Sequence, residues 1–396
     1  YEIPLRLVGS EMCIRDRGYR VGLFTSPHLV SINERIQIDG ENISDADFVW
    51  AFETVKEKFT QHPSFFEVMF AMAAVYFREK KCDFVVYETG MGGRLDATNV
   101  LMPELSIITS VGMDHMEYLG DTIEKIAAEK AGIIKPGIPI IYFKRDEAVA
   151  KVIEDTARGQ KSPVIPVEKQ DYIINHLGDK TIDFSLHSRY YSYCNLVIQK
   201  TSLYQLENIS LAVMAFYGLM KARNASEEDI EKGIRETLPE FYWEGRMEEI
   251  APHIYVDGAH NVEAIRAYID TMRTLHRDDR KILVFAAVRD KEYGAMISML
   301  ASQLKWDRII VTSVDSSRKA DSGKLAQIFA DNTDVPVLVS DEIDEAMDMA
   351  VALRTDIGTD LGRYGGQGID DVDIYCVGSL YLVGGVKRWR KKHDQF

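Results

Sequence analysis

The chain has 396 residues, of which 46% are hydrophobic and 28% charged, and its formal net charge is −15. This length predicts two or three domains of a globular protein. The acidic balance excludes a general nucleic-acid-binding protein, because clustered Lys and Arg hold phosphate backbones, but it allows small anionic ligands in a local pocket. No apolar run approaches about 18 residues, so we expect no membrane span. The four cysteines lie far apart, which favours a reducing cytoplasm over a disulfide framework or a paired-cysteine metal site.

The first predicted strand is Tyr19–Phe24, a short apolar run that the following Thr-Ser-Pro brings to an end. Residues 1–17 in front of it show neither the period of two of a strand nor the period of 3.6 of a helix. They contain no lysine and a single glycine, Gly9. This segment therefore differs in character from the rest of the chain.

Beyond it, apolar strand-like runs alternate with amphipathic helical stretches, which predicts α/β domains with parallel sheets covered on both faces. In the first half the pattern predicts strands at 83–87, 105–109 and 139–142, helices at 121–131 and 204–221, and antiparallel strands at 172–175 and 181–186. A second series predicts strands at 253–256, 282–286, 308–312 and 373–377 and helices at 261–275, 291–304, 321–331 and 342–354. We expect two domains, 18–245 and 246–396, joined near 244–250, and a mobile Gly/Asp-rich loop at 358–371.

The strongest candidate for chemistry is Val85–Asn99, V-V-Y-E-T-G-M-G-G-R-L-D-A-T-N, in which an apolar strand ends at Glu88 and a glycine-rich turn follows. Ligands of open α/β sheets gather at the carboxyl ends of strands. A carboxylate there can hold Mg²⁺ beside a phosphate, and glycines let the backbone approach a ligand. The alternative is a surface acid followed by a flexible turn, and the pattern alone supports both equally.

The next strand ends in S-V-G-M-D-H, which places Asp114 and His115 at the same edge. If the two strands are neighbours, about 4.8 Å apart, Glu88 and His115 could share one metal ion. A lone histidine after a strand more often belongs to a loop or to packing, so that alternative is open. Lys130 falls in the last turn of its predicted helix, where the residues alone favour a cation that stabilises the helix C-terminus.

Three further segments, which carry Asp257, Arg246 and the pair Gln205 and Asn208, could contact a nucleotide. Asp257 ends a strand in I-Y-V-D-G-A-H-N, before a helix that begins at His260 and Asn261, and such an acid can bind a ribose hydroxyl or a metal. Arg246 lies in the predicted inter-domain segment, where it is either a phosphate ligand or a solvated surface residue.

Gln205 and Asn208 lie one turn apart at the start of a predicted helix. Their amides could read a purine edge, or they could cap the helix.

In combination these stretches resemble the folylpolyglutamate synthase/dihydrofolate synthase family, within the Mur-ligase superfamily of ATP-dependent amide ligases. The similar motifs follow the family's order over residues 18–390, and TSPHL, GGRLDATN and DGAHN together are highly specific. The motifs are TSPHL (25–29), SFFE (64–67), ETGMGGRLDATN (88–99), DH (114–115), EKAGIIKPG (129–137), QLEN (205–208), EGRME (244–248), DGAHN (257–261) and GSLYL (378–382).

The resemblance implies an N-terminal P-loop-type mononucleotide-binding ATPase domain and a C-terminal Rossmann-like domain. It implies a cytoplasmic, monomeric ligase that adds L-glutamate to a reduced folate, to dihydropteroate, or to both, with ATP as co-substrate, Mg²⁺ at two sites and a monovalent cation. ATP would first phosphorylate the carboxylate, because oxide is too poor a leaving group. The amine of L-glutamate would then attack the acyl phosphate.

Site residues are carried over position by position. The matching metal ligands are Ser26, Glu88, His115 and Lys130, the last as a carbamylated lysine. The implied catalytic residues are Lys130, His115, Arg246 and His260. The implied ATP contacts are Gln205, Asn208, Arg246 and Asp257. The implied folate or pteroate contacts are Ser64, Phe65, Phe66, Glu67, Leu95, Asp96 and Ala97.

The chain also departs from the family pattern. Glu244 stands where the family usually has Pro, and Tyr204 stands where it usually has His; both changes are tolerable. The phosphate loop G-T-N-G-K-G-[ST] is absent from residues 1–17. We interpret this segment as foreign sequence, with a divergent authentic N-terminus as the alternative, and we expect weak ATP binding and slow turnover.

Three other functions compete with this interpretation. A folate- or nucleotide-binding pseudoenzyme would follow if loss of the loop abolished catalysis. A nicotinamide dehydrogenase is disfavoured, because no G-x-G-x-x-G follows the first strand of either domain. A cell-wall Mur ligase shares the mechanism, but TSPHL and SFFE favour the folate branch.

Overall fold

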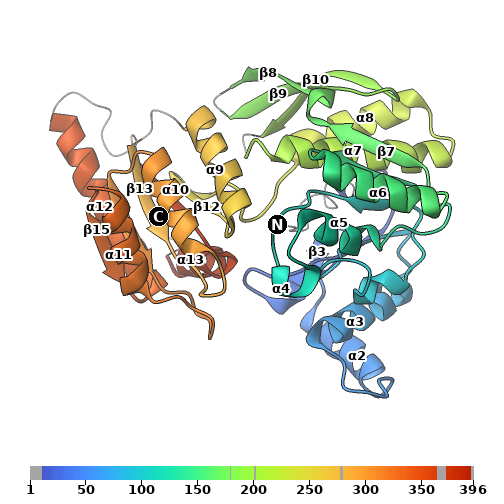
Figure 1. Cartoon of the computed structure of the whole chain (residues 1–396), viewed down its shortest axis with the longest axis horizontal. Helices are drawn as coiled ribbons and strands as arrows, with labels where there is room; N and C mark the ends of the chain where they lie inside the picture. Colours follow the sequence, from blue (N-terminus) through green and yellow to red (C-terminus); the bar gives the residue numbers. More distant parts are fainter. Residues whose placement is uncertain (1–10, 179, 200–201, 277–279, 364–371, 394–396) are drawn as a thin grey trace. The chain divides into compact units, whose positions relative to one another are not determined.

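The computed structural model describes residues 11–393 except 179, 200–201, 277–279 and 364–371 (Figure 1). The chain divides into two units. Residues 1–200 and 205–242 form unit 1, and residues 201–204 and 243–396 form unit 2. Residues 201–204, just before helix α7 (Gln205–Ala222), therefore belong to unit 2, although α7 itself belongs to unit 1.

The first sheet of unit 1 has the strand order β3-β2-β1-β4. β1 runs parallel to β4, with Phe24 opposite Tyr87, and antiparallel to β2. Helix α3 begins after Ser64, which forms a capping box with Glu67, and its buried face packs around Phe24. The ends of β1 and β4 consequently lie side by side. The bounds are β1 Val21–Phe24, η1 Ile32–Arg35, β2 Ile36–Ile38, β3 Glu41–Asn42, α2 Asp45–Lys56, α3 Phe65–Glu79, β4 Phe84–Tyr87 and η2 Ala97–Val100.

A second, parallel sheet of unit 1 has the order β5-β6-β7. The sequence pattern did not predict β7, because Pro166 interrupts its apolar run and proline is confined to edge strands. In the structure β7 is an end strand of this sheet, where proline is tolerated. The bounds are β5 Ser106–Ile108, α4 Met116–Leu119, α5 Ile123–Ala131, β6 Ile140–Lys144, α6 Glu147–Gly159 and β7 Val164–Glu168.

The third sheet of unit 1 is antiparallel, in the order β10-β9-β8. The expected antiparallel strands are present, and β10 adds a third that the pattern missed. An irregularity between Tyr193 and Leu196 breaks the alternation of β10. The bounds are η3 Lys169–Asp171, β8 Tyr172–Leu177, β9 Thr181–His187, β10 Ser192–Gln199, α7 Gln205–Ala222, α8 Glu227–Thr237 and η4 Leu238–Glu240.

The described part of the atypical N-terminal segment, residues 11–17, begins as a helical turn packed in unit 1. Cys13 and Ile14 are each 1% exposed, and burial raises the pKa of Cys13 to about 12. The hydroxyl of Thr237 donates to Asp16 at 2.7 Å. The foreign origin of the segment stays a prediction.

Glu11 in the same turn provides a pH-dependent test of this packing. Burial raises its pKa from 4.5 to about 7, so the folded state favours the protonated acid. Its stabilising contribution is therefore full below pH 4.5 and is lost as the pH rises through about 7. We expect Glu11→Gln to exceed the wild type by about 2 kcal/mol in unfolding free energy at pH 8 and to match it near pH 5. Urea unfolding at both pH values measures this, with the exposed Glu57→Gln as control. An equal difference at both pH values would contradict the assignment.

Unit 2 is built on a six-stranded sheet of order β11-β12-β16-β13-β14-β15, parallel except for β11. All six residues of β16 are buried, as expected of a parallel strand covered on both faces. Helices α9, α10 and α11 pack in sequence against one another, and α12 packs against α13. The expected α/β fold in two units is thereby confirmed. The bounds are β11 Glu248–Ala251, β12 Ile254–Asp257, α9 Val262–Leu275, β13 Arg280–Phe285, α10 Tyr293–Gln303, β14 Arg308–Thr312, α11 Ser322–Asn332, β15 Val337–Ser340, α12 Ile343–Arg363, β16 Val372–Val377 and α13 Leu380–Lys392.

The predicted mobile loop at 358–371 is partly wrong. Helix α12 continues to Arg363, past the end that the sequence predicted at residue 354. The rest of the predicted loop, 364–371, lies outside the described residues. None of the helices in the described part of the chain combines the length and apolar character needed to cross a bilayer.

Candidate functional site

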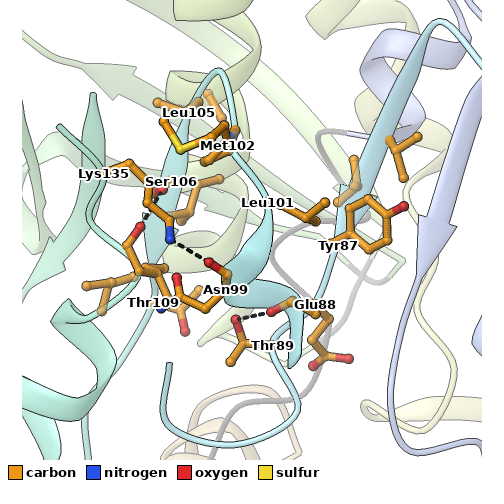
Figure 2. A pocket seen from close by; sticks show the side chains of 18 of the residues that line it. Tyr87, Glu88, Thr89, Asn99, Leu101, Met102, Leu105, Ser106, Thr109 and Lys135 are labelled. Atoms are coloured by element: carbon orange, nitrogen blue, oxygen red, sulfur yellow. Dashed lines mark hydrogen bonds between the residues drawn. The ribbon is translucent and has the colours of Figure 1, made fainter. Parts of the chain in front are cut away.

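A cavity of about 330 Å³ opens in unit 1 between β4 and β5. Figure 2 shows Tyr87 and Glu88 on the β4 side and Ser106 and Lys135 across the cavity from them. The hypothesis that these two strands pair is wrong for the described strands, because β4 pairs with β1 and β5 pairs with β6. They belong to separate sheets and line the same cavity instead.

Glu88 is a buried carboxylate at the mouth of this cavity, with 6% of its surface exposed. Its backbone N–H donates to Phe24 O at 2.9 Å and extends the pairing of β4 with β1. Its Oε2 accepts from the backbone N–H of Ser26 at 2.5 Å. The parallel pairing thus brings Ser26 and Glu88, both matched to metal ligands, into direct contact. The alternative of a surface acid is wrong.

Lys130 lines the same cavity from the last turn of α5 and is 9% exposed. It is placed there by two glycines. A Cβ on Gly93 would lie 2.9 Å from the carbonyl oxygen of Lys130, and a Cβ on Gly132 would lie 2.4 Å from Arg94 Cβ. Arg94 also pairs with Glu129 at 2.8 Å. The glycine-rich turn therefore packs flat on the end of α5, and the two motifs hold Lys130 at the cavity together.

Substitution of Gly93 by Ala should accordingly destabilise unit 1. The added Cβ meets backbone oxygens, which cannot rotate away, and overpacking of this kind costs about 1–3 kcal/mol. Urea unfolding followed by circular dichroism measures the loss. Gly159→Ala is the matched control, because nothing lies within 4 Å of its Cβ position, and we expect it to be neutral or slightly stabilising. Equal midpoints for the two variants would contradict the packing argument.

His115 lies on the loop after β5, at the N-cap of α4, with a left-handed φ of 52°. Its backbone N–H donates to Asp114 Oδ1 at 2.8 Å. It is not among the described residues that line the cavity around Glu88 and Lys130. Among the described residues, no three or more His, Cys, Asp or Glu side chains gather as a preformed metal site. The shared metal of Glu88 and His115 therefore stays a prediction.

The SFFE segment begins helix α3 and divides its side chains between two tasks. Ser64 and Glu67 bond to one another across the N-cap, with Ser64 N donating to Glu67 Oε2 at 2.6 Å. This bond lowers the pKa of Glu67. Phe66 packs inward, with its ring 5.5 Å from that of Phe24. Phe65 is 55% exposed, so its ring is open to a ligand, and Ser64 and Glu67 are exposed beside it.

The second candidate folate segment, Leu95 to Ala97, is organised in the same way. Asp96 accepts from the N–H groups of Gly90, Met91 and Thr98 at 2.9–3.1 Å, so its carboxylate holds the loop together. Leu95 is 82% exposed. Ala97 begins the short helix η2. Leu95 and Phe65 are thus the apolar side chains that these two segments offer to solvent.

Gln205 and Asn208 are buried at the start of α7, 0% and 2% exposed. Asn208 Nδ2 donates to Gln205 Oε1 at 2.6 Å. Gln205 Nε2 and Asn208 Oδ1 have no hydrogen-bond partner, although buried polar groups are nearly always paired. An adjacent donor and acceptor match the N7 and N6 groups of adenine. The capping alternative does not account for the bond between the two amides.

In unit 2, Asp257 is 1% exposed at the end of β12. It accepts from Met247 N at 3.0 Å, from Ala259 N at 2.8 Å and from the Tyr204 hydroxyl at 3.2 Å. Burial raises its pKa, and the charge of Arg246 opposes that shift. Tyr204, the residue that replaces the family's usual His, thus holds this carboxylate, a role that the sequence did not reveal.

Arg246 and His260 lie near the same turn of unit 2. Arg246 is 5% exposed, and its Nη1 donates to Gly245 O at 2.7 Å, so the solvated-surface alternative is wrong. Burial lowers the pKa of His260 well below its usual value, so the ring is neutral. His260 Nδ1 lies 2.6 Å from Gly258 O, which requires the proton on Nδ1 and leaves Nε2 as an acceptor.

Two ion pairs of unit 1, each beside a candidate site residue, had no signal in the sequence. Arg145 donates to both oxygens of Glu207 at 2.6 Å, one residue before Asn208. Arg94 and Glu129 join the glycine-rich turn to α5. Both pairs connect positions far apart in the chain, and a local pattern carries no information on such contacts.

Two family models match the chain: the Mur ligase middle domain over residues 49–216 and the Mur ligase, glutamate ligase domain over 245–359. The chain is 38% identical over 301 residues to the dihydrofolate synthase/folylpolyglutamate synthase of Bacillus subtilis, a match that covers 72% of this chain and 69% of that protein. It is 32% identical over 300 residues to the folylpolyglutamate synthase of Lacticaseibacillus casei, covering 72% and 68%.

Solved structures show the same likeness over nearly the whole chain. The folylpolyglutamate synthase of Thermotoga maritima has a TM-score of 0.78 at 29% identity, covering 98% of this chain and 86% of that one. The Mycobacterium tuberculosis folylpolyglutamate synthase complexed with ADP has a TM-score of 0.83 at 26% identity, covering 97% and 86%.

Proposed function

This chain belongs to the folylpolyglutamate synthase/dihydrofolate synthase family of Mur ligases, and we propose that it is an ATP-dependent ligase that joins L-glutamate to a folate, to dihydropteroate, or to both. The observation that carries this proposal is the buried Glu88 in contact with Ser26, beside the buried Lys130 at one cavity. The Bacillus subtilis relative is named for both activities, and the Mycobacterium tuberculosis structure holds ADP.

The chemistry requires activation of a carboxylate. A carboxylate oxygen of the folate attacks the γ-phosphorus of ATP, and ADP leaves. The amine of L-glutamate then attacks the acyl carbon, loses its proton and expels phosphate, which forms the amide. Water must be kept from the acyl phosphate, because hydrolysis would waste the ATP.

Mg²⁺ is the metal that the donor set at Ser26 and Glu88 fits. A buried carboxylate and a serine hydroxyl are hard oxygen ligands, which Mg²⁺ prefers. When bound there, the ion would neutralise charge on the phosphates of ATP. Lys130, buried at the same cavity, would supply a further oxygen donor if its amine were carbamylated. The resemblance adds His115, on the loop after β5, as a further ligand.

Nucleotide contacts are proposed separately for residues of each unit. We assign adenine recognition to the unsatisfied amide pair of Gln205 and Asn208. The buried Arg246 would contact phosphate, and the neutral His260 would lie near the reacting groups. Asp257 would act by holding the Met247 and Ala259 backbone in place.

One assay tests the proposal: ADP release with L-glutamate and either dihydropteroate or tetrahydrofolate. It should be run on this chain and on a variant whose residues 1–17 are replaced by a strand, a G-T-N-G-K-G-S loop and a helix. We expect glutamate-dependent ADP release from the loop-carrying variant and slower release from the present chain. A variant that binds ATP and folate but releases no ADP would favour the pseudoenzyme alternative. Equal rates for both would refute the expected role of the loop.

A further inference from the structure

The loop between β1 and β2 carries a buried arginine that the proposed function does not use. Arg35 ends the short helix η1 and is 8% exposed. Its backbone carbonyl accepts from Thr25 N at 3.0 Å, so it is fixed directly beyond the end of β1. A buried guanidinium is costly unless its donors and charge are matched.

One contact reaches the TSPHL segment. Arg35 Nε donates to His28 Nδ1 at 2.9 Å. The same segment places Ser26 against Glu88. The loop itself is firmly held, because the carboxylate of Glu34 accepts from the backbone N–H groups of Leu29, Val30 and Ser31 at 2.6–3.0 Å. Arg35 is therefore attached to a rigid loop.

A second contact reaches the SFFE segment. The guanidinium carbon of Arg35 lies 5.1 Å from the ring centroid of Phe65, within the range of a cation–π interaction. Phe65 is 55% exposed, whereas its neighbour Phe66 packs inward against Phe24. An exposed aromatic ring usually samples several rotamers, so a buried cation against it restricts where the ring can lie.

We propose that Arg35 is a positioning residue that fixes Phe65 as a stacking surface for the flat heteroaromatic ring of the substrate and ties it to the TSPHL loop. The inference rests on the proposed function, because the ligand is taken to be a folate or dihydropteroate. Arg35 acts through Phe65 and does not itself contact the reacting atoms. Its loss should weaken binding of the pterin-bearing substrate and leave ATP binding unchanged.

The test is a double-mutant cycle on dihydropteroate affinity, measured by isothermal titration calorimetry on the full chain. We expect Arg35→Gln to weaken dihydropteroate about tenfold and to change ATP affinity less than about twofold. In a Phe65→Leu background the same substitution should have less than about a twofold effect, because the shared contact is already gone. Arg78→Gln, at an exposed position late in α3, is the control and should match the wild type.

Three results would overturn the inference: unchanged dihydropteroate affinity in Arg35→Gln, effects of the two substitutions that simply multiply, or equal losses for ATP and dihydropteroate. Thermal unfolding of each variant identifies loss of folding. If Arg35→Gln does not fold, Arg35→Lys replaces it in the test, because lysine keeps the charge and lacks the planar Nε donor. We expect Arg35→Lys to weaken dihydropteroate binding about threefold. A wild-type chain that binds neither dihydropteroate nor tetrahydrofolate would refute the proposed function itself, and with it this inference.

Discussion

Replacement of Glu88 by Gln is expected to lower ATP-dependent glutamate ligation at least about 100-fold. The amide is nearly isosteric and is neutral, so it removes the buried negative charge beside Ser26 without leaving a cavity. The 2.5 Å bond from Ser26 N would persist only if the amide oxygen faced Ser26. Its NH₂ group would then occupy the position of the second carboxylate oxygen and could not ligate a metal.

The measurement is ADP release at saturating ATP, in this chain and in the loop-carrying variant. Glu79→Gln, at the exposed end of α3, is the control for general effects of losing a carboxylate. Urea unfolding should show Glu88→Gln to be as stable as the wild type or more stable, because burying an amide costs less than burying a charge. A variant with activity within about threefold of the wild type would remove Glu88 from the proposed metal site.

Replacement of Asn208 by Ala is expected to weaken ATP binding about tenfold and to leave GTP binding nearly unchanged, so that discrimination between the two falls. Asn208 Oδ1 is a buried acceptor without a partner. Adenine presents an amino group that can donate to it, whereas guanine presents a carbonyl oxygen at the same place. A good bidentate contact of this kind is worth about 1–3 kcal/mol.

Competition of ATP and GTP for the chain, measured by calorimetry, gives the ratio of affinities. Lys221→Ala, on an exposed position of the same helix, is the matched control and should preserve the ratio. If Asn208→Ala weakened ATP and GTP equally, the amide pair would have a structural role in α7, and adenine recognition would have to be sought elsewhere.

The fold could be predicted from the sequence where burial leaves a continuous signal. β16 is buried at all six positions, and its apolar run 374–377 is visible without any structure. β7 was missed because Pro166 breaks its run, and β15, an end strand of its sheet, directly follows Pro336. Edge and short strands carry weak patterns, since neighbours on one side alone constrain them.

Helix α13 shows a different limit. Gly384 and Gly385 stand in its middle, and glycine in a helix interior costs about 1 kcal/mol relative to alanine, which argues against a helix. The structure supplies the reason for one of them. A Cβ on Gly385 would lie 2.3 Å from Ile343 Cδ1, so the glycine permits close approach of α12 and α13. This benefit comes from a residue about forty positions away, and no local pattern contains it.

For the candidate site, the sequence identified the residue types. Only the tertiary structure showed which of these side chains are buried and which other residues they contact. Glu88 and Arg246 had surface alternatives that only burial could exclude. The pairing of the strands that carry Glu88 and His115 was wrong, because strand order within a sheet is not encoded in the order of strands along the chain. Tyr204 looked like a mere departure from a motif until its hydroxyl was found 3.2 Å from Asp257.

The interlocking of Gly93 and Gly132 has a consequence for how this region can change over time. A side chain gained at either position meets the other segment at less than 3 Å. The sequence of the glycine-rich turn and that of the end of α5 therefore cannot change independently of one another. In a deep collection of relatives, the two stretches should therefore vary as a correlated block. An engineer who transplants one of them into another scaffold would need to move its counterpart as well.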